Sequence, residues 1–175
     1  MASERQLSDV LREFARTMVT DFPIRSILEH LVARIVEIMP ISAAGVTLIS
    51  PGVEPRYIAA SNAAALRFEK LQTELGEGPN VAAYQTGEAI SVPDLRRQDQ
   101  FPQFTFRALQ AGLAAVFTFP LHHGDGQLGA LDLYRNTPGE LTAESMMAAQ
   151  TLADVATAYL INAQATARLE RRAAS

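Results

Sequence analysis

The sequence contains no cysteine, and Lys70 is its only lysine among 175 residues. The missing thiol excludes disulfides, thiolate nucleophiles, thioether-linked chromophores and metal centres built on cysteine. The first ten residues, MASERQLSDV, carry charges and no apolar run, so they do not resemble a signal peptide or an anchor. No stretch reaches the roughly 20 apolar residues of a membrane span. We therefore expect a cytoplasmic chain that does not bind membranes.

The charge balance is also informative. The formal net charge is -4 and the calculated pI is about 5.4, which argues against a nucleic-acid partner because such binding needs clustered Lys and Arg. Hydrophobic residues make up 48% of the chain and charged residues 19%. A chain of this length forms one domain with its own core. The apolar composition further predicts an additional buried interface.

Both ends of the chain have helical spacing of apolar residues. Amphipathic helices are predicted over 3–20 and 23–40, and a long one over 142–171 that begins at Thr142. Between Glu144 and Arg168 the only charged residue of the last helix is Asp154, so few of its positions suit solvent. We predict that the terminal helices of two chains form a homodimeric bundle. The residues predicted for this interface are Leu7, Leu11, Phe14, Met18, Leu152, Val155, Ala156, Tyr159, Leu160 and Ala163.

The middle of the chain alternates strands and short helices. Glycine and proline separate the segments, as in Ser50-Pro51-Gly52 and Gly76-Glu77-Gly78-Pro79, and Gly87 suits a left-handed helix cap. Strands are predicted over 43–49, 56–61, 89–92, 114–121 and 127–134, and helices over 63–75, 79–86 and 104–110. Periodicity alone thus predicts an α+β fold with an antiparallel sheet.

Two segments resemble a known family. Leu75-Gly76-Glu77-Gly78-Pro79-Asn80 and Leu128-Gly129-Ala130-Leu131-Asp132-Leu133-Tyr134 are similar to segments of GAF sensors from actinobacteria, and the resemblance extends over about 23–162. It implies a central antiparallel sheet with the terminal helices on one face. Helices and loops on the other face would enclose a ligand pocket. Relatives of this type often carry an RNA-binding antiterminator bundle, so the chain is either a stand-alone sensor or a fragment of a longer regulator.

The resemblance implies a non-enzymatic sensory domain that binds a small molecule, needs no cofactor and regulates transcription. The alternative is an interaction scaffold whose pocket is filled. Residues 1–22 would form a dimerisation helix, 23–165 the GAF domain and 166–175 a frayed tail. The Asn-Lys-Phe-Asp-Glu signature of the cyclic-nucleotide-binding members cannot be placed on this sequence, whose only lysine is Lys70. The lack of cysteine excludes the bilin-binding and methionine sulfoxide reductase chemistries of the family.

Candidate pocket residues follow from the resemblance, position by position. They are Val46, Leu48, Phe68, Leu71, Pro79, Ala83, Phe104, Phe106, Phe117, Phe119 and Asp132. Asp132 shares a strand face with Ala130 and Tyr134, where its carboxylate would support the structure or contact a ligand amine. No catalytic residue and no metal ligand is predicted: His122 and His123 are expected on a solvated hairpin, and His30 off the apolar stripe of its helix.

Overall fold

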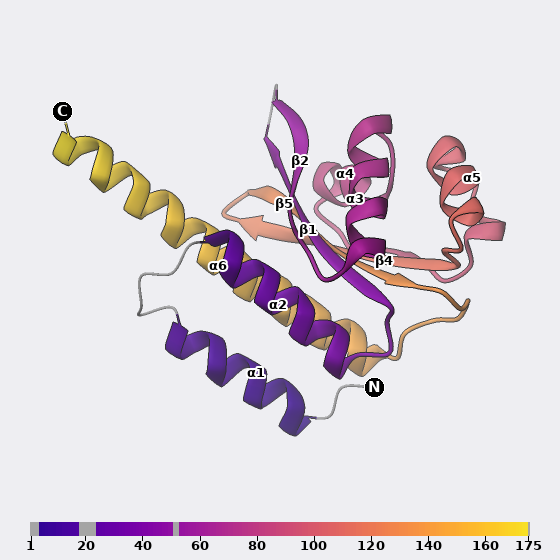
Figure 1. Cartoon of the computed structure of the whole chain (residues 1–175), viewed down its shortest axis with the longest axis horizontal. Helices are drawn as coiled ribbons and strands as arrows, with labels where there is room; N and C mark the ends of the chain where they lie inside the picture. The colour runs from indigo at the N-terminus through magenta and orange to yellow at the C-terminus, as the bar shows by residue number, and fades with distance from the viewer. Residues whose placement is uncertain (1–3, 18–23, 51–52, 175) are drawn as a thin grey trace.

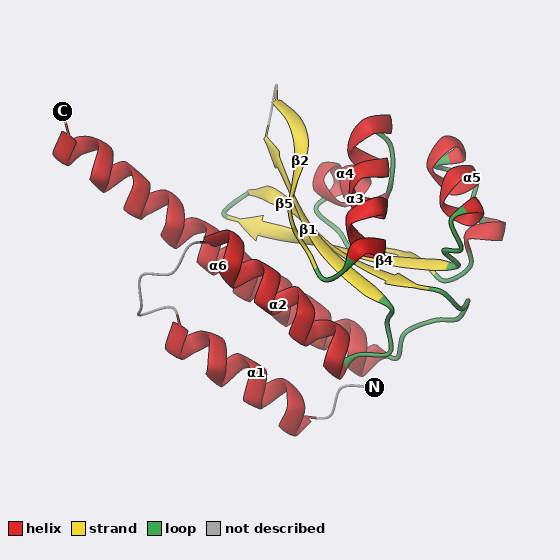
Figure 2. Ribbon diagram, viewed as in Figure 1, coloured by secondary structure: helices red, strands yellow, loops and turns green. Residues whose placement is uncertain are grey.

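A five-stranded antiparallel sheet lies between two helical layers in the computed structural model, which describes residues 4–17, 24–50 and 53–174 (Figures 1 and 2). One layer contains α2 (Ile24–Ile38) and α6 (Ala143–Ala174), and α1 (Glu4–Thr17) packs on the outer side of these two helices. The other contains α3 (Ala63–Leu75), α4 (Pro79–Thr86) and α5 (Pro102–Gln110), together with the short 3-10 helix η1 (Leu95–Arg97). This architecture confirms the predicted α+β fold and the placement of the terminal helices on one face.

The strand order of the sheet is β2-β1-β5-β4-β3. The strands are β1 (Ala43–Ser50), β2 (Val53–Ala60), β3 (Ile90–Val92), β4 (Ala115–His123) and β5 (Gly126–Arg135). In the central register, Asp132 of β5 lies opposite Gly45 of β1 on one side and Thr118 of β4 on the other. This row later forms the floor of the candidate site.

Alternation along the strands divides the sheet into two different faces. Val46, Phe119 and Leu131 face the layer of α2 and α6, where they join the larger apolar core. The residues between them face α3 and α4, and several of these are polar, among them Thr47 and Asp132. A second, smaller apolar core surrounds this polar region with residues of α3, α5 and the sheet.

Local signals in the sequence account for most helix boundaries. Asn62 caps α3 by accepting the backbone N–H of Ala65 at 2.9 Å, and Thr142 caps α6 by accepting that of Ser145 at 3.1 Å. Gly87 ends α4 in the left-handed conformation with φ of 73°, as predicted. The tail predicted to fray from 166 instead continues α6 to Ala174, because nothing in its sequence breaks a helix.

Candidate functional site

Buried polar side chains from the sheet, α3 and α4 meet on the face opposite α2 and α6. All of them have no exposed surface. They are Thr47, Glu69, Gln72, Asn80, Thr118, Asp132 and Tyr134, and we call this group the polar cluster. Polar groups in a protein interior are costly unless they find partners, and such clusters mark candidate functional sites. The geometry of this group therefore decides what the region can bind.

The secondary structure brings the polar cluster together in a simple way. Glu69 and Gln72 are three residues apart on α3, so they share the helix face that looks at the sheet. Glycine leaves room for both side chains: a Cβ on Gly45 would overlap the side chain of Glu69, and one on Gly78 would overlap that of Gln72. The approach of α3 to the sheet thus depends on these two glycines.

Tyr134 is the centre of the first half of the hydrogen-bond network. Its hydroxyl donates to Oε2 of Glu69 and accepts from Nε2 of Gln72 at 2.9 Å. The Thr47 hydroxyl donates to Oε1 of Glu69 at 3.2 Å. Oε1 of Gln72 accepts the backbone N–H of Asn80 at 3.0 Å, which ties α3 to the start of α4. Both oxygens of Glu69 therefore have donors.

Asp132 and Asn80 form the half of the hydrogen-bond network in which some acceptors have no partner. Oδ1 of Asp132 accepts the Thr118 hydroxyl at 2.7 Å, and Nδ2 of Asn80 donates to Oγ1 of Thr47 at 3.4 Å. Oδ2 of Asp132 and Oδ1 of Asn80 are buried without a hydrogen-bond partner. Buried polar atoms in folded proteins are nearly always paired. Each of these two atoms can therefore accept a further hydrogen bond.

Burial dominates the electrostatics of the polar cluster. It raises the pKa of Glu69 well above its ordinary range, and the nearby Asp132 carboxylate raises this pKa further. Burial also raises the pKa of Asp132, although hydrogen bonds, first that from Glu69, act in the opposite direction. Burial thus favours the neutral form of both carboxyls, and the titration of each one depends on the charge of the other.

The polar cluster is rich in acceptors and carries no positive charge. Among the described ion pairs, none involves Glu69 or Asp132. The described residues also contain no group of three His, Cys, Asp or Glu side chains that could hold a metal ion. The chemistry of the polar cluster is thus complementary to N–H donors and to positive charge.

The predicted pocket residues do not all lie at the polar cluster. Asp132 belongs to it, Pro79 and Ala83 are buried on α4, and Phe68, Leu71 and Phe104 form the apolar core around it. Val46, Leu48, Phe117 and Phe119 face α2 and α6 instead, because strand alternation sends them to the other side of the sheet from Asp132. Phe106 is 64% exposed on the outer side of α5.

Sequence reasoning missed six members of the polar cluster. They are Thr47, Glu69, Gln72, Asn80, Thr118 and Tyr134. A usable signal was present, since Glu69 and Gln72 stand beside the apolar Phe68 and Leu71 on α3. Period-2 alternation also places Thr47 and Thr118 between large apolar residues of their strands.

The residues predicted for a dimer interface lie in the helical layer of a single chain. Phe14, Leu152, Ala156, Tyr159 and Leu160 are buried there, while Leu7, Leu11, Val155 and Ala163 are partly exposed. Met18 lies outside the described residues. Much of the apolar surface predicted for a partner chain is thus covered by other elements of the same chain, namely α1, α2 and the sheet.

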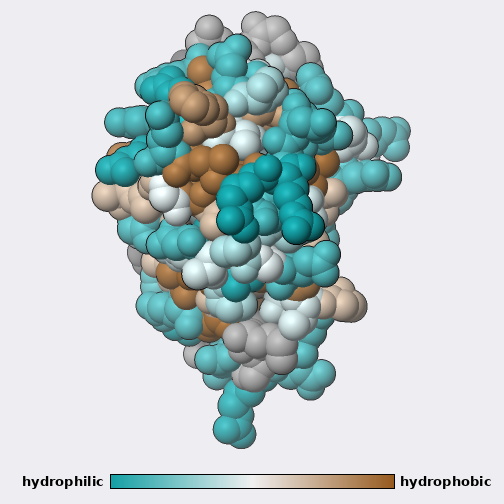
Figure 3. Space-filling view, turned by 90° about the vertical axis from the view of Figure 1, so that its right-hand side faces the viewer, coloured by the Kyte–Doolittle hydropathy of each residue, from teal (hydrophilic) through white to brown (hydrophobic). Residues whose placement is uncertain are grey.

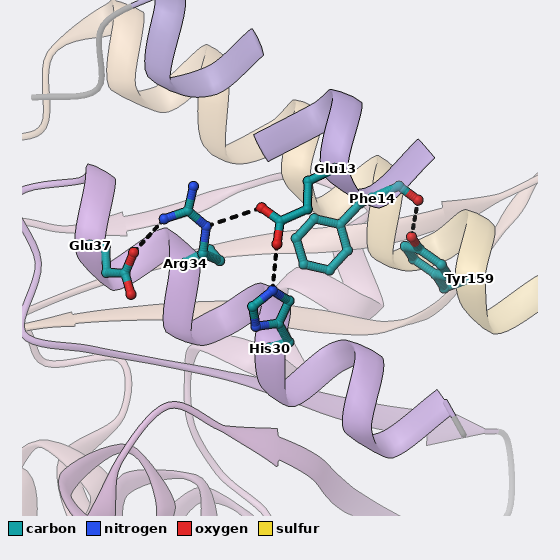
Figure 4. A network of polar contacts seen from close by, with 6 residues as sticks. All are labelled: Glu13, Phe14, His30, Arg34, Glu37 and Tyr159. Carbon is teal, nitrogen blue, oxygen red and sulfur yellow. Dashed lines mark hydrogen bonds and ion pairs between the residues drawn. The ribbon is translucent and has the colours of Figure 1, made fainter. Parts of the chain in front are cut away.

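Polar contacts attach α1 to both helices beneath it (Figure 4). Glu13 bonds Nε2 of His30 at 2.6 Å and accepts from Nε of Arg34 at 3.3 Å, both on α2. The Phe14 ring lies 5.3 Å from the ring of His30, and the Tyr159 hydroxyl of α6 donates to the Phe14 carbonyl. The hydrogen bond from His30, the largest influence, lowers the pKa of Glu13. The end of α1 is therefore the part that is held most specifically.

A layered α+β domain with a closed polar interior beneath helices is the class that this fold and site define. The family model described as GAF domain matches residues 23–160. The chain belongs to the GAF family, whose members are sensory and regulatory domains that bind small molecules.

Solved structures agree on the fold. The GAF domain of a phosphoenolpyruvate-protein phosphotransferase from Coxiella burnetii has a TM-score of 0.74 at 17% identity, covering 95% of this chain and 99% of that one. Free methionine-R-sulfoxide reductase from Neisseria meningitidis, solved with its substrate, gives 0.73 at 14% identity over 95% and 96%. A corresponding Acinetobacter domain gives 0.71 at 15% identity over 93% and 96%.

The other comparisons add little to this assignment. No curated protein matches the sequence significantly. Within the described residues, no helix combines the length and the apolar character that crossing a membrane requires.

Proposed function

We propose that this chain is a sensory domain that binds a small, positively charged organic molecule at the polar cluster. The ligand class follows from the chemistry of the site, which offers acceptors and negative charge. An ammonium or guanidinium group would donate to Oδ2 of Asp132 and Oδ1 of Asn80. The same charge would favour release of the proton that burial keeps on the carboxyl pair.

The observation that carries this proposal is the pair of buried acceptors without partners. A purely structural core gains nothing from two carboxyls in contact with each other, since apolar packing of the same volume is often equally stable or more stable. Their position also agrees with the family, in which a small molecule is bound by the domain. One structural relative, the Neisseria meningitidis reductase, was solved with a substrate bound. We infer binding without turnover, because this chain lacks the thiol chemistry that the family's reductases use.

The route of the signal would lead through the sheet to the helical layer. The side chains of β1, β4 and β5 contact the polar cluster on one face and the core of α2 and α6 on the other. A ligand that prefers one position of α3 and α4 would shift the population of two arrangements of the helices. We propose that these arrangements belong to a homodimer, in which the partly exposed Leu7, Leu11 and Val155 contact the partner.

A ligand screen with charge-matched variants tests the proposal. Thermal unfolding is followed with agmatine, ethanolamine and their uncharged analogues, for wild type, Asp132→Asn and the exposed control Asp125→Asn. A specific ligand at about 100 times its Kd raises the unfolding free energy by about 2.7 kcal/mol. We expect stabilisation of wild type and Asp125→Asn by a cationic probe, and its loss in Asp132→Asn. Equal responses in all three variants contradict the proposal.

A second candidate is an interaction scaffold whose pocket is filled by its own side chains. The hydrogen bonds among Tyr134, Glu69 and Gln72 favour it, because they already occupy the space above the sheet. Native mass spectrometry separates the two candidates. A scaffold purifies without a small molecule and forms no complex with any cationic probe, whereas a sensor retains or gains one.

A further inference from the structure

A groove outside the polar cluster runs between α3 and α5. Its volume is about 410 Å³, and its lining includes Arg67, Lys70 and Glu74 of α3 with Arg107 and Gln110 of α5. Figure 3 shows the face of the molecule that carries α5, where strongly hydrophilic side chains gather beside apolar ones. The volume is in the range of small-molecule sites. The groove therefore has room for a ligand.

Positive charge converges on this groove. Arg67 and Lys70 are three residues apart, so they share one face of α3, and Arg107 approaches from the last turn of α5. In the described part of the chain, none of these three side chains forms an ion pair or a hydrogen bond. The chain as a whole has a formal charge of -4, and Lys70 is its only lysine. The concentration of cations is thus local and opposite to the overall charge.

The remaining lining defines the ligand more closely. Glu74 contributes one negative charge, which leaves a net charge of +2 around the groove. The buried side chain of Leu71 and the partly buried Ala111 provide an apolar wall, and Gln110 offers an amide. A ligand that satisfies all of these groups carries about two negative charges next to an apolar body.

We propose that the groove between α3 and α5 binds a small organic dianion of the phosphate-ester type. Its anionic group contacts Arg67, Lys70 and Arg107, and its apolar part lies against Leu71 and Ala111. This site is distinct from the polar cluster, since α3 presents Glu69 and Gln72 to the sheet and the cationic pair to solvent. The domain accordingly has two sites of opposite charge preference on the two sides of one helix.

Isothermal titration with phenyl phosphate tests this site. Wild type binds with a Kd of about 1 mM or lower, and inorganic phosphate binds more weakly because it lacks the apolar part. Arg107→Gln weakens binding about fivefold to tenfold, as loss of one charge-assisted contact predicts. Glu74→Gln tightens it about twofold to threefold, since it removes a repulsive charge. The control Arg56→Gln, an exposed arginine on β2, leaves the Kd unchanged.

Other outcomes overturn the assignment. Absence of saturable phenyl phosphate binding to wild type refutes the site, and equal binding of inorganic phosphate refutes the organic ligand. If Arg56→Gln and Arg107→Gln lose the same amount of phenyl phosphate affinity, the anion binds outside the groove. Weaker binding of phenyl phosphate by Glu74→Gln leads to the same conclusion. Asp132→Asn is expected to bind phenyl phosphate like wild type. This separates failure of the groove from failure of the polar cluster.

Discussion

Replacement of Glu69 by glutamine tests the central electrostatic claim, because Glu69→Gln keeps the shape of the side chain and removes its titration. The ordinary pKa of this carboxyl is 4.5, and burial raises the pKa well above that value in the folded state. Above about pH 4.5 the unfolded chain therefore loses a proton that the folded chain retains. The free energy of unfolding of wild type must then fall as pH rises, until the folded pKa is reached.

The size of the effect follows from linkage. One proton held only in the folded state changes the unfolding free energy by about 1.4 kcal/mol per pH unit. Glutamine is neutral in both states, so Glu69→Gln lacks this slope. Its amide oxygen still accepts the hydroxyl hydrogen of Tyr134. We expect the variant to gain stability relative to wild type by about 1.4 kcal/mol for each unit above pH 5 within this window.

Urea unfolding at intervals from pH 5 to 8 measures the difference directly, with circular dichroism at each pH to verify the fold. The control is Glu88→Gln, which changes an exposed glutamate between α4 and β3. Its stability should follow that of wild type at every pH. If the curves of wild type and Glu69→Gln run parallel, then Glu69 titrates normally in the folded protein. The conclusion that burial raises the pKa of Glu69 would then be wrong.

Three further substitutions test how the elements around the two layers are held. Gly45→Ala forces a Cβ into the side chain of Glu69 and should cost about 1–3 kcal/mol in urea unfolding, whereas Gly126→Ala, with no close neighbour, should be nearly neutral. Glu77→Ala removes the carboxylate that accepts two backbone N–H groups at the start of α5, at 2.9 and 3.1 Å. We expect the free energy of unfolding to fall by about 1 kcal/mol and amide exchange in α5 to become faster. Glu13→Gln weakens the attachment of α1 by up to about 1 kcal/mol at neutral pH, and because the folded pKa of Glu13 is lowered, the difference from wild type should vanish as pH falls through that pKa. An unchanged exchange rate in α5, or a Glu13 effect that grows in acid, would contradict the corresponding contact.

The local part of the fold was accessible from the sequence because local chemistry decides it. The helices over 63–75 and 79–86 have the predicted bounds, since Asn62, Pro79 and Gly87 provide start and stop signals within a few residues of each end. The hairpin of β4 and β5 was recognised from its alternating apolar residues and its glycine turn. The shared face of Ala130, Asp132 and Tyr134 follows from alternation alone.

The candidate site was less accessible because burial is a property of packing. Alternation shows that Phe117 and Thr118 point to opposite faces, but it does not reveal which face α2 and α6 cover. Val46 and Phe119 of the predicted pocket therefore lie on the face that α2 and α6 cover, opposite the polar cluster. Glutamate on a helix is usually exposed, so the sequence gives no reason to expect Glu69 to be buried. Its burial results from the close approach of α3 to Gly45 of the sheet.

The sequence by itself determined the order of elements and the antiparallel sheet, since spacing, caps and turn residues act over a few positions, and its resemblance to GAF sensors indicated the family. Tertiary structure alone decided that Asp132 shares a closed compartment with Glu69, and that Arg67 meets Arg107 across a groove. These pairs come from segments far apart in the chain. Their distances, exposure and charge states depend on how the helices pack against the sheet. No local sequence pattern specifies this packing.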